Sequence, residues 1–204
     1  AQLAVSGSNV EKLEAFRASL GGDHVAVPCN LGDKDSVEAL VPAALEKLGK
    51  IDILVNNAAT NPVFGPIHDT TLDAFDKIMN VNLKAPFQLM RLCLPYLKLS
   101  ENPSVINISS VGGISPEAGL GIYSVSKAAL ISMTKAFAKE WGELNIRVNA
   151  ICPGLIKTKF SEQGKMSRYH SLDIIAASIL INEITQKSVA QVFFEDVFPN
   201  IKPE

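Results

Sequence analysis

The chain has 204 residues, 47% of them hydrophobic and 20% charged, which predicts a single domain over residues 1–204 with a substantial core. Its 19 Lys and Arg against 21 Asp and Glu give a net charge of -2, so it lacks the strongly basic surface that nucleic acid binding requires. The three cysteines and three histidines are scattered, so we expect free thiols and no metal site. No apolar run approaches the ~20 residues of a membrane span, and the first residues do not resemble a signal peptide. We therefore expect an intracellular, cytoplasmic protein without membrane attachment.

In the first third of the chain, short apolar runs rich in Val and Ile alternate with longer amphipathic segments, which is typical of parallel βαβ units. The first strand is expected at 3–5, and a cap at Ser8 or Asn9 starts a helix that Gly21-Gly22 ends. The next elements are, in order, a strand at 24–28, a helix at 35–48 and a fully apolar strand at 51–55.

The same alternation continues to residue 151. A long helical pattern covers 71–99, with a break or kink at Pro86 and an end near Pro95. It is followed by a strand at 104–109, a helix at 124–144 and a strand at 146–151. The remaining expectations are a loop or short lid over 153–172, a helical pattern over 172–184 and a final strand at 189–194.

These elements predict one three-layer α/β sandwich with a doubly wound parallel sheet. Such sheets bind ligands outside the carboxyl ends of their strands. Polar or glycine-containing segments follow five of the expected strands: Ser6-Gly7-Ser8, Asn30, Asn56-Asn57-Ala58-Ala59, Ser109-Ser110 and Pro153-Gly154. Turns need Gly, Asn and Ser in any case, so each segment taken alone is more readily explained as a turn.

A sharper candidate site combines Ser110, Tyr123 and Lys127. Tyr123 and Lys127 are four residues apart on an expected helix, so the ammonium can lie near the phenol and favour its ionised form. Such a tyrosine can exchange a proton with a carbonyl or an alcohol near neutral pH. Ser110, at a strand end, can hold the reacting oxygen, and Asn82 can add a further polar group.

With these residues, the chain resembles the short-chain dehydrogenases/reductases over about residues 1–160, which implies a Rossmann-like fold. Asn56-Asn57-Ala58-Ala59 is similar to the family's Asn-Asn-Ala-Gly motif. Asn82, Ser110, Tyr123 and Lys127 match its catalytic tetrad, and 153–158 is similar to the segment beside the nicotinamide. The chain resembles both the carbonyl and retinol reductases and the β-ketoacyl reductases of this family.

The resemblance implies an NADP-dependent oxidoreductase that interconverts a carbonyl and an alcohol. Tyr123 would be the acid/base, and Lys127 would lower its pKa and hold the nicotinamide ribose. Ser110 would orient and polarise the substrate oxygen, and Asn82 would position a water that links Lys127 to solvent. The cofactor would carry the hydride chemistry.

The implied cofactor contacts are Ser6, Gly7, Ser8, Asn30, Leu31, Asn57, Ala58, Ala59, Tyr123, Lys127, Pro153, Gly154, Ile156 and Thr158. An acidic residue near the end of strand 3–5 would select NAD by binding the ribose hydroxyls. Neither an acid nor an Arg stands in Ser6-Gly7-Ser8, so we expect NADP and keep NAD as possible.

The chain departs from the family at both ends. The family's glycine-rich fingerprint is missing, because residue 1 falls at the start of the family's second strand, so the first β-α unit and its pyrophosphate site are not in this sequence. Either the protein lacks them, which would expose sheet edges, or these residues exist outside the given sequence. Residues 173–204 match the family's last helix and strand weakly, and a join across missing residues between 161 and 171 would explain this.

Two other functions stay open at this point. A non-catalytic family member or fragment, acting as an interaction or regulatory module, would account for the missing fingerprint. An epimerase or dehydratase of the related extended family would also use Tyr and Lys, but the short chain and the Asn56-Asn57-Ala58-Ala59 segment argue against it.

The expected partners are a small apolar ketone, aldehyde or alcohol and further copies of the chain. Apolar residues near the site suggest such a substrate: Phe64, Ile67, Ile114 and Leu120. The long helices carry apolar residues on more than one side, which predicts a homodimer or homotetramer or, alternatively, deeper burial within one subunit. These residues are Leu89, Leu92, Leu94, Leu97, Ala128, Leu130, Ile131, Ala136 and Phe137.

Overall fold

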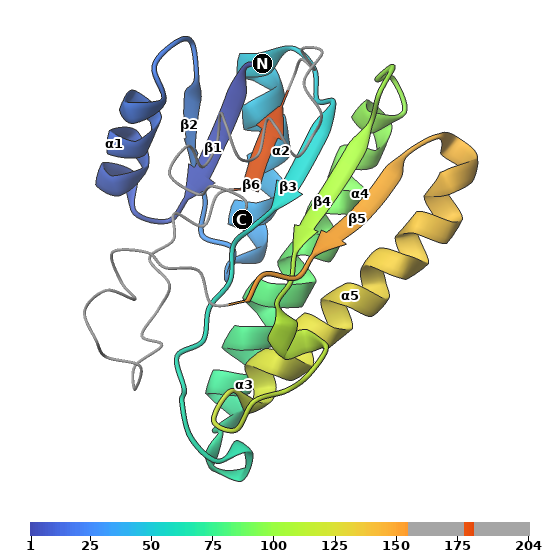
Figure 1. Ribbon diagram of the computed structural model, residues 1–204. Coiled ribbons are helices and arrows are strands. Elements are labelled where there is room, and N and C mark those ends of the chain that lie inside the picture. Colours follow the sequence, from blue (N-terminus) through green and yellow to red (C-terminus); the bar gives the residue numbers. More distant parts are fainter. Residues whose placement is uncertain (155–177, 182–204) are drawn as a thin grey trace.

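The computed structural model of the chain describes residues 1–154 and 178–181 (Figure 1). Its strands are β1 (Leu3–Gly7), β2 (Val25–Pro28), β3 (Ile53–Asn56), β4 (Ser104–Ile108), β5 (Arg147–Ile151) and β6 (Ser178–Ile181). Its α-helices are α1 (Val10–Leu20), α2 (Lys34–Leu48), α3 (Leu72–Met79), α4 (Ala85–Leu97) and α5 (Gly121–Trp141). Short helical turns are η1 (Ile67–Asp69), η2 (Asn80–Lys84), η3 (Val111–Gly113) and η4 (Gly142–Leu144).

One sheet of six strands, in the order β2-β1-β6-β3-β4-β5, forms the centre of the molecule (Figure 1). The pairs β1 with β2, β3 with β4 and β4 with β5 are parallel, with Val5 opposite Ala26 and Leu54 opposite Val105. The expected doubly wound α/β fold and its first five strands are confirmed. The order places the carboxyl ends of β3, β4 and β5 at one edge of the sheet.

The sixth strand differs from the sequence prediction. β6 runs antiparallel between β1 and β3, with Leu180 opposite both Ala4 and Leu54. The helix predicted over 172–184 is therefore wrong at 178–181. A short apolar run is compatible with either helix or strand, and here pairing with two open strand edges decides the outcome. The strand predicted at 189–194 and the lid over 155–172 lie outside the described residues.

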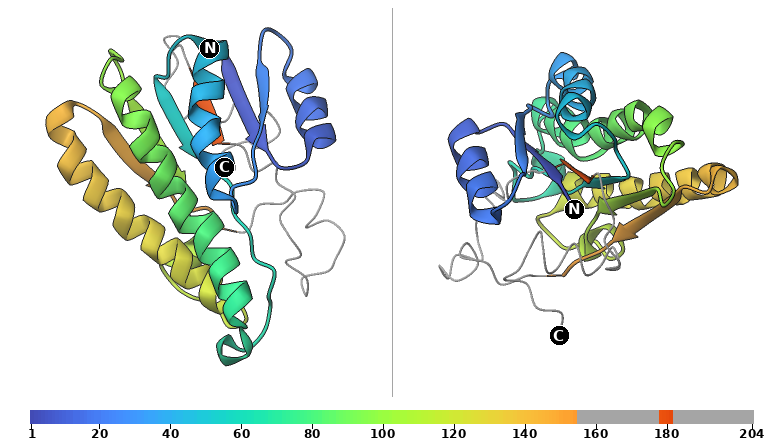
Figure 2. Two further views of the ribbon diagram at one scale, coloured as in Figure 1. Left: turned by 180° about the vertical axis from the view of Figure 1, so that it is seen from behind. Right: turned by 90° about the horizontal axis from the view of Figure 1, so that it is seen from above.

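Alternating side chains of the strands fill two separate cores. Ala4, Leu54 and Val105 pack on one face of the sheet against α2, α4 and α5, whereas Val5 and Ile53 lie in the core on the other face, which contains Leu13 of α1. The views from behind and from above show these helices on the two sides of the sheet (Figure 2). The described part is thus a layered structure in which α5 lies along β4 and β5.

Side-chain caps start the helices where the sequence predicts them or close to it. Asn9 accepts from the Lys12 N–H at 2.9 Å, and Asp33 accepts from the Ser36 N–H at 2.7 Å. Gly49 ends α2 in the left-handed conformation, with φ 75°. These local signals explain why the helix boundaries in the first half of the chain were predictable.

The long helical segment at 71–99 is divided by a π-helical turn. α3 leads directly into η2 and then into α4, and the Ala85 N–H donates to the Asn80 carbonyl, so the helix is continuous. Pro86 has no N–H, so one main-chain helix bond is missing directly after η2. Instead of a break at Pro86, the structure has a π-helical turn over Asn80–Lys84 within a continuous helix. This turn buries the side chain of Asn82 completely, with 0% exposure.

Candidate active site

The candidate site lies at the carboxyl ends of β3, β4 and β5, where α5 begins and η2 approaches. Asn56 is opposite Asn107, and Ile108 is opposite Ile151, so the three strands end side by side. The Ser109 N–H donates to the Ile151 carbonyl at 2.7 Å, and the Val111 N–H donates to the Pro153 carbonyl at 3.0 Å. The segments after β4 and β5 are thereby fixed to each other.

Lys127 is a buried cation in this region. Its side chain is 1% exposed, and its Nζ donates to the Ile108 carbonyl at 2.7 Å. Burial lowers the pKa of Lys127 from 10.5 to about 8, and nearby Cys152 opposes this change. At neutral pH the group is still mostly an ammonium, which makes it a positive charge held inside the protein.

Tyr123 lies one helical turn before Lys127 and is half-buried. The Nζ of Lys127 is 5.8 Å from the centre of the Tyr123 ring, within the range of cation–π attraction. The predicted proximity of the ammonium to the tyrosine ring is thus present in the structure. Its effect on the acidity of the phenol remains a prediction.

Ser110 stands at the start of η3 in an extended conformation. Its Oγ accepts from the Gly112 N–H at 3.1 Å, and its side chain is half-buried. Its hydroxyl hydrogen could therefore be directed toward a substrate oxygen.

Gly113 brings η3 unusually close to α5. A Cβ added at Gly113 would lie 2.7 Å from the main-chain carbon of Lys127 and 2.9 Å from the nitrogen of Ala128. Ser109 adds a second contact between these segments, because its Oγ donates to the Lys127 carbonyl at 2.8 Å. The distance between the Ser110 segment and Lys127 is therefore fixed by packing and by a hydrogen bond.

The side chain of Asn82 contacts two other segments. Its Nδ2 donates to the Thr60 carbonyl and to Ser126 Oγ, both at 3.0 Å, and its Oδ1 accepts from the Thr60 N–H at 2.8 Å. The amide thus joins η2 to the segment after β3 and to α5. The water between Lys127 and solvent that the resemblance implies for Asn82 stays a prediction.

A buried polar chain that the sequence analysis missed crosses the strands below the site. Asn56 Nδ2 donates to Asn107 Oδ1 at 2.8 Å, and Asn107 Nδ2 donates to Thr134 Oγ1 at 2.9 Å. Thr134 in turn donates to the Leu130 carbonyl at 2.7 Å. The detectable signal was Asn107 itself, a polar residue in the middle of an apolar strand.

The residues predicted to hold the adenosine part of a cofactor lie at the ends of β1 and β2. Ser6 and Gly7 are buried, whereas Ser8 and Asn30 are exposed. Asn30 Oδ1 accepts from the Gly32 N–H at 3.0 Å, which is a local turn bond. Leu31 packs against the core. In the sheet, β6 separates β1 and β2 from β3, β4 and β5, whose ends carry the candidate site.

The remaining predicted contacts lie after β3 and β5. Ala58 is buried, Asn57 and Ala59 are half-buried, and Pro153 is bonded to the loop after β4 as described above. Gly154 is exposed, while Ile156 and Thr158 lie outside the described residues. The structure therefore brings Asn57–Ala59, Ser110, Tyr123, Lys127 and Pro153 to one edge of the sheet.

These residues fit the reactive end of a nicotinamide cofactor better than its diphosphate. Lys127 supplies a buried cation 5.8 Å from the centre of the Tyr123 ring, and the side chains of Tyr123 and Ser110 are half-buried. In the described part of the chain, no glycine-rich turn leads from a strand beside β1 into a helix N-terminus, which is the usual diphosphate site.

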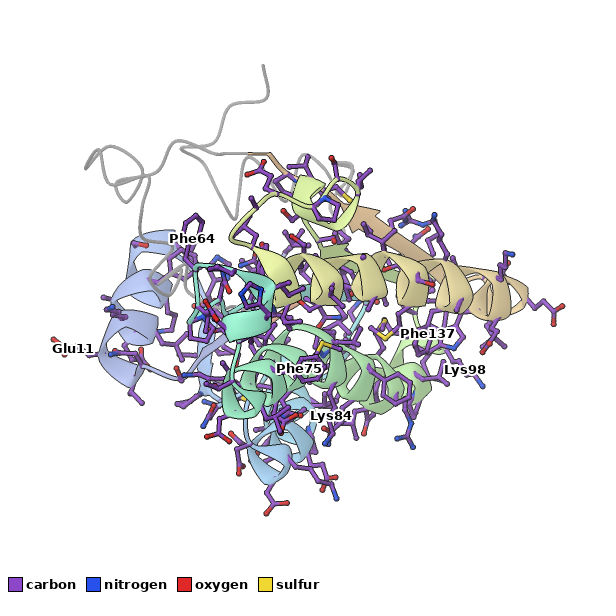
Figure 3. All side chains as sticks on the ribbon, turned by 90° about the horizontal axis from the view of Figure 1, so that it is seen from below. Glu11, Phe64, Phe75, Lys84, Lys98 and Phe137 are labelled. Atoms are coloured by element: carbon purple, nitrogen blue, oxygen red, sulfur yellow. The ribbon has the colours of Figure 1, made fainter. Side chains whose placement is uncertain are left out.

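A shallow groove lies away from this site, on the outer side of α3, α4 and α5. It has a volume of about 450 Å³ and is lined mainly by apolar side chains, among them Met79, Leu83, Phe87 and Met133. The side chain of Phe137 on α5 points toward α4 (Figure 3), with its ring centre 5.9 Å from that of Phe87. Of the residues expected to mark an oligomer face, Leu89, Leu97 and Leu130 are instead buried within the chain.

Two further expectations concern metals and membranes. Among residues 1–154 and 178–181, no group of His, Cys, Asp and Glu side chains is arranged to hold a metal ion, and no helix has the length and apolar character for a membrane span. All three cysteines are free thiols.

Comparisons with known proteins place this geometry in a family. The family model described as Enoyl-(Acyl carrier protein) reductase matches residues 1–194. Dehydrogenase/reductase SDR family member 4 of Homo sapiens is 40% identical over 164 residues, and that of Sus scrofa is 42% identical over 165 residues. Each match covers 79% of this chain and 59% of the relative, so the chain spans about three fifths of the length of these proteins.

Solved structures agree with this assignment. A metagenomic short-chain oxidoreductase (SDR) in complex with NADP has a TM-score of 0.69 at 32% identity, over 74% of this chain and 70% of that one. An NAD+-bound xylitol dehydrogenase has a TM-score of 0.75 at 27% identity, over 82% of this chain and 68% of that one. The chain belongs to the short-chain dehydrogenase/reductase family.

Proposed function

We propose that the chain carries the active site of an NADP-dependent oxidoreductase that interconverts a ketone or aldehyde and an alcohol. The observation that carries this proposal is the buried Lys127, fixed at 2.7 Å from the Ile108 carbonyl and 5.8 Å from the ring of Tyr123. A buried cation beside a half-buried tyrosine is suited to proton transfer, because the positive charge stabilises the phenolate.

In the direction of reduction, Tyr123 gives its hydroxyl proton to the carbonyl oxygen of the substrate and becomes a phenolate. A nicotinamide cofactor, when bound, would supply the hydride for the carbonyl carbon. The C=O double bond becomes a C–O single bond, the product is the alcohol, and Tyr123 regains a proton from solvent. Lys127 stabilises the phenolate throughout, and Ser110 donates a hydrogen bond to the same substrate oxygen.

The cofactor would be held by residues at the same edge of the sheet. Lys127 and Tyr123 would contact the nicotinamide ribose, and Asn30 and Leu31 would flank the adenine. Neither an acid nor an Arg stands in Ser6-Gly7-Ser8, so the 2′-phosphate of NADP would meet no repulsion, and NAD stays possible. The relative crystallised with NADP and that crystallised with NAD+ support both cofactors as candidates.

An apolar rim supports a small apolar substrate. Phe64, Ile67 and Ile114 are 48%, 52% and 68% exposed, so their apolar surfaces are open to a ligand. Phe64 projects from its loop in the view from below (Figure 3). The loop at 64–67 contacts the start of α5, since the Gly65 N–H donates to the Gly119 carbonyl at 3.2 Å. The Ile67 side chain also lies against Gly121, the first residue of the helix that bears Tyr123.

We also propose that copies of the chain associate through α4 and α5. Phe87 is 41% exposed and Val125 is 46% exposed on these helices, and the apolar groove described above adjoins Phe87. Light scattering tests this by comparing the molar mass in solution of the unaltered chain with that of a Phe87→Glu variant. If both are monomers, the proposed association is refuted.

The first experiment is a titration of the chain with NADPH and, separately, with NADH, followed by the cofactor's fluorescence. Saturable binding together with turnover of an apolar ketone would support the proposal. Tyr123→Phe should then keep cofactor binding within about threefold and lower kcat by at least 100-fold, the scale of general acid catalysis. Binding of neither cofactor would favour the non-catalytic module instead.

A further inference from the structure

Ser126 lies between the two reactive residues of α5, one position before Lys127 and three after Tyr123. Its side chain is 0% exposed. Its Oγ donates to the Tyr123 carbonyl at 2.7 Å and accepts from Asn82 Nδ2 at 3.0 Å. One hydroxyl therefore connects the main chain at Tyr123 to the buried amide of Asn82.

Both hydrogen-bond donors of the Asn82 amide are used at this point. Its two Nδ2 hydrogens donate to Thr60 and Ser126, and its Oδ1 accepts from the Thr60 N–H. Asn82 is 0% exposed, so water cannot easily replace a partner that is lost. Removal of the Ser126 hydroxyl would leave a buried N–H without an acceptor.

We propose that Ser126 is a positioning residue, whose hydroxyl joins Asn82 to Tyr123 and so fixes the Tyr123–Lys127 turn against the loop that contains Thr60. This inference rests on the proposed function, because that loop and that turn would form two sides of the reaction site. Ser126 itself touches neither substrate nor cofactor in this scheme. It acts by keeping the Tyr123 hydroxyl at the distance that proton transfer requires.

Ser124 offers a matched control in the same helical turn. It is also a serine with 0% exposure, but its Oγ has no hydrogen-bond partner among the described residues. Replacement of either serine by alanine removes one buried oxygen from α5 and raises helix propensity slightly. The two variants therefore differ mainly in whether a hydrogen-bond link is broken.

The first test compares turnover of Ser126→Ala and Ser124→Ala, with kcat expressed per NADPH-binding site. We expect Ser126→Ala to lower kcat by about three- to tenfold, the scale of one or two hydrogen bonds, with KM for substrate and Kd for NADPH within twofold. We expect Ser124→Ala to match the unaltered chain. Equal losses in both variants, or a change in KM alone, would overturn the inference.

The second test does not depend on turnover. Hydrogen exchange of the Thr60 amide reports the bond to Asn82 Oδ1. We expect faster exchange in Ser126→Ala than in Ser124→Ala, and no further acceleration when Ser126→Ala is added to Asn82→Ala, because the link is already broken. Unchanged Thr60 exchange in Ser126→Ala would overturn the inference.

The two tests separate this inference from the proposed function. If the unaltered chain turns over no carbonyl substrate, the proposed function fails, and with it any part of Ser126 in that reaction. Faster Thr60 exchange in Ser126→Ala would then still assign the hydroxyl as a link between the two segments. If turnover is present and only the serine comparison fails, the proposed function stands without Ser126.

Discussion

Asn56 and Asn107 lie opposite each other on β3 and β4, and the Nδ2 of Asn56 donates to the Oδ1 of Asn107 at 2.8 Å. The Nδ2 of Asn107 in turn donates to the Oγ1 of Thr134 on α5. All three side chains are buried. Two strands and the helix that bears Tyr123 and Lys127 are thus joined by side-chain bonds as well as by the sheet ladder.

Asn107→Ala should lower the free energy of unfolding by about 2–4 kcal/mol, because it opens a small cavity and leaves the Asn56 amide unpaired in the core. Urea denaturation measures this change. The exposed Asn102 provides the control, and Asn102→Ala should stay within about 0.5 kcal/mol. Equal stability of the two variants would show that the buried chain contributes little.

Gly113→Ala should destabilise the chain by about 1–3 kcal/mol, since the added Cβ would meet the main chain of α5 at 2.7 Å and helix backbone cannot easily yield. Thermal unfolding measures this loss. Gly142 is the matched control, because a Cβ there meets nothing within 4 Å and its φ is -57°. Gly142→Ala should be neutral or stabilising by up to about 1 kcal/mol. A reversed order of the two variants would contradict the close packing of η3 on α5.

Lys127 should make stability depend on pH in the alkaline range. Burial lowers its pKa from 10.5 to about 8, so between these values the unfolded chain binds more protons at this site than the folded chain. The free energy of unfolding should therefore rise with pH from about 8 to about 10.5, by at most about 3 kcal/mol.

The comparison for this prediction is Lys127→Met, which keeps the chain length without the titrating group. Urea denaturation at a series of pH values gives the free energy of unfolding of the unaltered chain and of the variant. The difference between the two removes the contributions of the other lysines and of the tyrosines. The same difference at every pH would mean that Lys127 titrates normally in the folded state.

Leu180→Pro should disrupt the centre of the sheet, because proline removes the N–H that a central strand needs on one side. β6 pairs with both β1 and β3, so amides of both neighbours should exchange faster with deuterium. Leu180→Ala keeps the N–H and serves as the control. If the amides of β1 and β3 exchange at the same rate in the proline and alanine variants, pairing with β6 does not protect these two strands.

Much of the fold followed from patterns that are local in the sequence. Apolar runs such as 51–55 and caps such as Asn9 act over a few residues, and their strands and helices lie where they were expected. β6 was not predictable in this way, because its direction and place depend on β1 and β3, which are distant in the chain. The π-helical turn at Asn80–Lys84 likewise has no local signal comparable to a proline or a cap.

The candidate site was predictable to a similar degree. The spacing of Tyr123 and Lys127 and the position of Ser110 at a strand end place all three at one edge of the sheet. The supporting residues Ser126 and Asn107 were missed, because they look like ordinary helix or strand residues until their partners are known. Ser109 was noted as part of a polar segment, but its bond to the Lys127 carbonyl was not anticipated. Periodicity shows which face of an element a residue is on but does not identify its hydrogen-bond partner.

The position of β6 also has a consequence for how the chain reaches its native state. β1 and β3 are synthesised before β6, the strand that separates them, and β6 follows β3 by more than a hundred residues. At about 5–20 residues per second, a ribosome would hold these two strands without their shared neighbour for roughly ten seconds. Pairings so distant in sequence also form slowly. We therefore expect the nascent chain to need protection of these strand edges, for example by a chaperone, until residues 178–181 have been synthesised.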